Sequence, residues 1–124
     1  MPALDVKVSA KLKENQKDAL PVSELDFVDQ FTDIGGYEGV RRVVIPAGET
    51  VTVGVTNIDK LRHLFVKVLS GSASGVRLDV KKSQSESTAF AFYTYFCADV
   101  KGADTVRFTA FDQDVILLVL TAGL

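Results

Sequence analysis

The sequence predicts an all-β protein, an antiparallel β-sandwich or jelly roll of about eight to nine short strands. Three observations lead to this class. Apolar residues alternate with polar ones along most of the chain, turn-forming residues recur between these segments, and no segment has the period of an amphipathic helix. The 124 residues suffice for one domain but not for two. We therefore expect a single domain over residues 1–124, in which residues 1–24 form an N-terminal strand or arm.

The N-terminal part of the chain contains two strand-like segments. Within residues 4–13 the apolar side chains occupy every second position, as in a strand with one wet face: Leu4, Val6, Val8, Ala10 and Leu12. A polar loop then leads to a second strand over residues 25–31, with Leu25, Phe27 and Phe31 on one face and Asp26 and Gln30 pointing outward. Residues 33–36 (Asp-Ile-Gly-Gly) predict a turn or a flexible loop.

The middle of the chain predicts four further strands. Residues 40–45 and 49–55 flank Pro46, Ala47 and Gly48, for which we expect a type I turn with proline second and glycine fourth, joining a hairpin. Residues 61–69 are apolar on both faces, which is typical of a covered strand. A Gly-rich loop over residues 70–75 precedes an alternating strand at residues 76–81.

The C-terminal part is rich in aromatic and aliphatic residues. We expect residues 88–100 to form one strand, with Phe90, Phe92 and Phe96 in the core and Tyr93 and Tyr95 on the opposite face. Two last strands are expected at residues 105–111 and 115–121. The final strand is apolar on both faces, so it either lies centrally in its sheet or is covered by another chain.

The composition argues against several functional classes. Fourteen basic and sixteen acidic residues give a net charge of −2 without a basic block, so we expect neither nucleic-acid nor membrane binding. Cys97 is the single cysteine and His63 the single histidine, which leaves no internal disulfide and no zinc site of the usual kind. We expect no metal and no cofactor. The N-terminus lacks the pattern of a signal peptide, and the longest apolar run is too short to span a bilayer.

The residues with catalytic potential do not assemble into an enzyme motif. The run from Gly71 to Gly75 resembles a nucleophile elbow, but Ala73 occupies the place of the nucleophile. We interpret His63 as a structural or surface residue, and Cys97 as a buried residue whose apolar setting raises its thiol pKa. We therefore predict that the protein is not an enzyme.

Two acidic pairs have the residue types used in glycoside hydrolysis and calcium binding. Asp26 and Asp29 form the first pair and Asp112 and Asp114 the second. Both chemistries need a fixed separation or several further oxygens. Because aspartates stabilise turns through bonds to nearby backbone, we assign Asp112 and Asp114 to a turn.

Exposed apolar and aromatic residues predict a protein interface. Tyr93 and Tyr95 lie beside small alanines and form an amphipathic surface of the composition found at interfaces. In the last strand Ile116, Leu118 and Leu120 share one face, and uncovered they would be an aggregation hazard.

Two further pairs complete the predicted interface. Arg41 and Arg42 are adjacent, so in a strand they point to opposite faces, and one needs an edge position or an acidic partner. Val6 and Val8 belong to a segment that can add an edge strand to the domain or reach a neighbouring chain.

Several stretches resemble a known group of proteins. Residues 25–36 (LDFVDQFTDIGG), residues 42–53 (RVVIPAGETVTV), the two strands within 61–80 and the closing Val/Leu-rich strand resemble small virion proteins of tailed bacteriophages, the head decoration or cement proteins and their jelly-roll relatives. The resemblance covers most of the chain through strand spacing and turn chemistry. It implies a homodimer or homotrimer that binds the major capsid protein of a phage head. It also implies a location on the capsid surface of the virion after synthesis in the host cytoplasm.

We therefore predict a non-enzymatic structural virion protein that stabilises a capsid lattice. The alternative is a carbohydrate-binding or other ligand-binding β-sandwich, with Tyr93 and Tyr95 as stacking platforms and Asp112, Gln113 and Asp114 as hydrogen-bonding groups. A cupin-type enzyme shares the jelly-roll outline, but a single histidine does not supply the ligands that such metal sites use.

Overall fold

The computed structural model describes residues 2–53, 58–71, 73–82 and 87–123. Contacts divide the chain into two compact units, Met1–Asp33 and Ile34–Leu124. In the described ranges every regular element is a β-strand, and no helix there is long and apolar enough to cross a membrane.

The first unit is a β-hairpin. Strands β1 (Leu4–Leu12) and β2 (Ser23–Phe31) pair antiparallel, with Leu4 opposite Phe31 and Leu12 opposite Ser23. The polar face of this hairpin is held by a hydrogen bond in which Gln30 Nε2 donates to Asp5 Oδ1 at 2.9 Å. The alternation predicted for residues 4–13 and 25–31 therefore gives the two expected strands.

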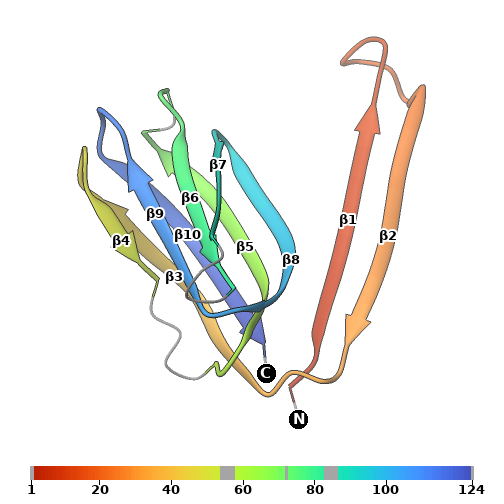
Figure 1. Ribbon diagram of the computed structural model, residues 1–124. Helices are drawn as coiled ribbons and strands as arrows, with labels where there is room; N and C mark the ends of the chain where they lie inside the picture. Colours follow the sequence, from red (N-terminus) through yellow and green to blue (C-terminus); the bar gives the residue numbers. More distant parts are fainter. Residues whose placement is uncertain (1, 54–57, 72, 83–86, 124) are drawn as a thin grey trace. The chain divides into compact units, whose positions relative to one another are not determined.

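The second unit is a two-layer sandwich of antiparallel sheets (Figure 1). The strand orders are β3-β10-β5-β8 and β4-β9-β6-β7, and every connection between consecutive strands crosses from one sheet to the other except that between β6 and β7. The strands are β3 (Gly36–Ile45), β4 (Thr50–Thr52), β5 (Leu61–Ser70), β6 (Val76–Lys81), β7 (Ser87–Phe92), β8 (Tyr95–Ala103), β9 (Thr105–Ala110) and β10 (Val115–Gly123). This is the arrangement of a jelly roll, so the predicted fold class is confirmed.

The core lies between the two sheets. Ile45, Leu64, Leu78, Phe108 and Leu117 are each 0% exposed. Strand β10 is central in its sheet, paired with β3 on one side and β5 on the other. The sequence left two explanations for this apolar strand, a central position in its sheet or burial against another chain, and the strand is central. Its inner side chains Val115, Leu117 and Val119 are buried in the core.

The prediction of a hairpin around residues 46–48 is wrong. Strands β3 and β4 lie in different sheets, because the turn between them carries the chain across the sandwich. The turn also begins one residue later than predicted: Glu49 N donates to Pro46 O at 3.0 Å, and Gly48 at the third position has φ of 75°. Positive φ at that position requires glycine in a type II turn. Of the strand predicted at 49–55, Thr50–Thr52 is strand, and residues 54 and 55 lie outside the described residues.

The single strand predicted at residues 88–100 is also wrong. The chain bends at Tyr93 and Thr94, and β7 and β8 on either side belong to different sheets. The phenylalanines of both strands still meet in the core. The ring centroids of Phe90 and Phe92 lie 4.8 and 5.9 Å from that of Phe96, so these rings join the two layers.

Candidate functional site

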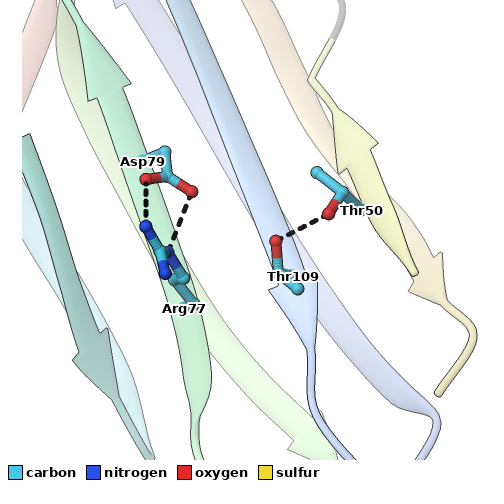
Figure 2. A network of polar contacts seen from close by, with 4 residues as sticks. All are labelled: Thr50, Arg77, Asp79 and Thr109. Atoms are coloured by element: carbon cyan, nitrogen blue, oxygen red, sulfur yellow. Dashed lines mark hydrogen bonds and ion pairs between the residues drawn. The ribbon is translucent and has the colours of Figure 1, made fainter. Parts of the chain in front are cut away.

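The outer face of the β4-β9-β6-β7 sheet is an ordinary wet surface, which we call the polar sheet face. Figure 2 shows two of its contacts: Arg77 Nε and Nη2 donate to the carboxylate of Asp79 at 3.3 Å, and the Thr50 and Thr109 hydroxyls lie 2.8 Å apart. The strand registers place only polar residues and alanines here: Thr50, Thr52, Arg77, Asp79, Lys81, Ser87, Ala89, Ala91, Thr105, Arg107 and Thr109.

The outer face of the β3-β10-β5-β8 sheet is apolar, and we call it the open sheet face. Leu118 is directly opposite Arg42 on β3 and Lys67 on β5, and Leu120 is opposite Phe65, so these side chains share one face. The registers and alternation assign these residues to it: Tyr37, Val40, Arg42, Val44, His63, Phe65, Lys67, Leu69, Tyr95, Cys97, Asp99, Ile116, Leu118, Leu120 and Ala122. Uncovered apolar faces of this kind mark interaction sites.

Exposure on the open sheet face is high. Val40 is 67% exposed, Val44 54% and Tyr95 67%. Between them an open hollow of about 400 Å³ is lined almost entirely by apolar groups, from Val40, Phe65, Val66, Lys67, Tyr95, Cys97, Leu118, Val119 and Leu120. Five of the predicted interface residues, Arg42, Tyr95, Ile116, Leu118 and Leu120, therefore lie together on this surface.

Arg42 and Lys67 are the two cations of the open sheet face. Both are exposed, and they flank Leu118 from the two neighbouring strands. Neither forms an ion pair with the part of the chain that the structure describes. The face therefore combines a broad apolar surface with positive charge at its centre.

Arg41 points away from this face. It is directly opposite Val119, whose side chain is buried in the core, and its Nη1 lies 3.5 Å from Glu38 Oε2. The adjacent arginines thus face opposite sides of edge strand β3, and the one on the inner side has the acidic partner that this position requires.

Cys97 is exposed, which corrects its predicted burial. The prediction failed because Cys97 lies on the outer face of its sheet, which no second layer covers within this unit. Partial burial among neighbouring groups still raises the pKa of the thiol, and a hydrogen bond with the Val66 backbone lowers it by less. Cys97 therefore lies on the open sheet face, opposite Phe65, in a weakly reactive form.

Tyr93 and Tyr95 do not form one platform. Tyr95 belongs to the open sheet face, whereas Tyr93 lies in the bend before β8 and its ring lies close to the backbone of Gly75. Asp114 Oδ1 accepts a hydrogen bond of 2.8 Å from Ala47 N and so ties together two turns at one end of the sandwich. This contact agrees with the turn role assigned to Asp114.

Of the remaining residues of catalytic type, His63 and Asp99 are neighbours on adjacent strands. His63 is 2% exposed in β5, opposite Asp99, whose carboxylate accepts a hydrogen bond from Arg62 Nε at 3.3 Å. In the elbow-like run, Ser72 lies outside the described residues. No group of three His, Cys, Asp or Glu side chains within the described ranges is placed to hold a metal ion.

The hairpin also has one apolar face, which we call the apolar hairpin face. Its members are Leu4, Val6, Val8, Ala10, Leu12, Leu25, Phe27 and Phe31. Val6 and Val8 are half-buried, and Asp29, opposite Val6, is the one charged residue on this side. Asp26 is opposite Ser9 on the other face, so the suggested pair of Asp26 and Asp29 is separated by the strand itself.

Sequence reasoning missed half of the open sheet face. Val40, Val44, Phe65, Lys67 and Leu69 were not predicted as site residues. A signal was present, because residues 61–69 and 115–120 are both apolar on two faces. Two such strands that pair side by side leave one shared apolar face outside the core.

Comparison with known proteins finds one distant structural similarity. No family model and no curated protein matches the chain. One solved structure, the cupin domain of Schizosaccharomyces pombe Cnp3, is similar at 12% identity and a TM-score of 0.45, over 97% of this chain and 84% of that one. A likeness this distant does not bear on activity.

Proposed function

We propose that the protein is a non-enzymatic structural protein that assembles with other proteins through the open sheet face. The observation that supports this most directly is the contrast between the two outer faces of one sandwich. The polar sheet face carries threonines, charges and alanines, whereas the open sheet face carries large aliphatic and aromatic side chains. A sheet normally keeps one face wet, so an apolar outer face is expected to be covered in the working state.

The residues of catalytic type support the same proposal. His63 is buried away from any dissolved substrate, Asp114 is engaged in a turn, and the pKa of Cys97 is raised, which disfavours its thiolate. A general base or nucleophile has to be reachable and in the correct protonation state. These three side chains are better suited to structural roles.

The more specific form of the proposal is a decoration or cement protein of a phage capsid, with the major capsid protein as partner and the capsid surface as location. Jelly rolls occur in capsid and lectin domains alike, so the fold alone does not select between these functions. The choice rests on the open sheet face and on the resemblance of residues 25–36 and 42–53 to virion proteins. Binding at several equivalent lattice sites would add avidity to weak individual contacts.

The hollow on the open sheet face favours a second candidate, a ligand-binding module. Its volume of about 400 Å³ lies within the range of small-molecule sites. The lining offers one tyrosine, Tyr95, for stacking and few polar groups, because Asp112 and Asp114 belong to the turn between β9 and β10. The hollow therefore suits an apolar ligand better than a sugar.

Two measurements separate these candidates. Mass spectrometry of purified virus particles from the source is expected to detect the chain as a stoichiometric component. Calorimetric titration of the isolated protein with oligosaccharides, and separately with an apolar fluorescent dye, tests the ligand-binding module. A chain absent from particles that binds an oligosaccharide saturably would replace the structural proposal with the second candidate.

A further inference from the structure

The apolar hairpin face lacks a core of its own. A two-stranded hairpin has no second layer, and isolated hairpins are marginally stable in water. Here Leu25 is 59% exposed, Phe27 41% and Leu12 64%. A hairpin of nine-residue strands with these side chains on one face is expected to be stabilised by packing against another surface.

The two uncovered surfaces have opposite charge. Asp29 is the one charged side chain on the apolar hairpin face, and it has no ion-pair partner among the described residues. Arg42 and Lys67 are the cations of the open sheet face, and they flank the exposed side of Leu118, whereas Asp99 lies farther along the same face beside Arg62. An apolar surface with an acid therefore matches an apolar surface with two bases.

We propose that the hairpin of one copy of this chain packs its apolar face on the open sheet face of a second copy, with Asp29 beside Arg42 and Lys67. The proposal rests on the assembly function above and specifies its first partner, which is the chain itself. When each copy packs its hairpin on the other, the two copies form a closed dimer with twofold symmetry.

The area involved favours exchange in both directions. A hairpin with strands of nine residues is about 30 Å long and 10 Å wide, so one face covers about 300 Å². One docked hairpin would then remove about 600 Å² from the two partners together, and two would remove about 1,200 Å². Stable interfaces begin at about 1,200 Å² in total, so a reciprocal pair reaches the threshold that a single contact does not.

Cys97 gives a direct test because it is the only cysteine and lies on the open sheet face. One chain carries Cys97→Ala together with Val6→Cys or Ala10→Cys on the apolar hairpin face. The second chain is the wild type with a distinguishing affinity tag. The two are mixed, unfolded, refolded together and treated with a short bismaleimide, and linked peptides are identified by mass spectrometry.

The proposal predicts a cross-link between the hairpin cysteine of one chain and Cys97 of the other. Lys7→Cys and Ser9→Cys, on the polar face of the same strand, are the matched controls and are expected to link at least about tenfold less. Links found only within one chain, in a protein that retains Cys97 and carries Ala10→Cys, would overturn the exchange. An oligomer without any hairpin link would overturn it too and leave the assembly function standing, whereas a monomer that binds no protein would contradict both.

A charge exchange provides a second measurement. Asp29→Lys is expected to weaken self-association at least about tenfold, as expected for a close interfacial charge pair. Combining Asp29→Lys with Arg42→Asp and Lys67→Asp is expected to restore most of the affinity. Equal weakening by Asp26→Lys, on the opposite face of the hairpin, or no restoration in the combined variant, would contradict the assigned contact.

Discussion

Arg42 and Lys67 lie on opposite sides of Leu118, each directly across from it on a neighbouring strand. Adjacent strands are about 4.8 Å apart, so the two cations lie within about 10 Å on one apolar face. Positive charges this close repel each other and gain little from the leucine between them. In the proposed exchange, Asp29 of a second copy would lie beside both cations and offset this repulsion.

The two faces of β10 are expected to respond differently to truncation. Leu117→Ala removes a fully buried side chain and should lower the free energy of unfolding by about 2–5 kcal/mol. Leu118→Ala removes a half-exposed one and should cost about 1 kcal/mol in dilute protein. Urea unfolding at low protein concentration measures both. Equal losses would mean that the assignment of inner and outer faces is incorrect.

Thr121 has a buried hydroxyl whose replacement should be harmless. Its side chain is 0% exposed, and Oγ1 has no hydrogen-bond partner in the described structure. Thr121→Val keeps the shape and removes the desolvated hydroxyl, so we expect an increase in stability of about 1 kcal/mol. Thr109→Val is the control, because it removes the contact with Thr50 and should destabilise by about 1 kcal/mol. Thermal unfolding followed by circular dichroism distinguishes these results; a clear loss in Thr121→Val would show that the hydroxyl is satisfied.

The thiol of Cys97 should react slowly at neutral pH. Desolvation favours the neutral thiol and raises its pKa, so the thiolate appears at higher pH than in an unfolded peptide. The folded state thus holds this proton more tightly, and its contribution to stability is present below the unfolded pKa and lost as pH rises through the folded one. Disulfide-reagent kinetics between neutral and alkaline pH, compared with the protein in urea, measure the shift. A folded-state rate profile displaced to lower pH would contradict it.

The sequence predicts the strands well and their partners poorly. Alternation over residues 4–13 and 76–81 gives β1 and β6 almost to the residue, because one face of each strand is wet. Alternation does not report which sheet a strand joins. The segment with Phe92, Tyr93 and Tyr95 keeps its two-residue alternation through the bend at Tyr93. The turn at Pro46 is equally compatible with a hairpin and with a crossing between sheets.

The open sheet face likewise depends on strand pairing that the sequence does not reveal. Ile116, Leu118 and Leu120 are identifiable from β10 alone, because a strand with two apolar faces needs two coverings. Phe65 and Lys67 join them only through the antiparallel register of β5 with β10, which is a non-local property. The exposure of Cys97 has the same non-local origin, since the pairing of β8 with β5 places it on the outer face, opposite Phe65.

Sedimentation velocity of the full chain over a range of concentrations, with two matched variants, tests assembly through the open sheet face most directly. Leu118→Glu places a carboxylate opposite Arg42, and Ala91→Glu places one opposite Arg77 on the polar sheet face. We predict that the wild type and Ala91→Glu sediment as an oligomer and that Leu118→Glu sediments as a folded monomer. A wild type that remains monomeric and binds no particle protein, or a Leu118→Glu variant that assembles as well as the wild type, would contradict the account.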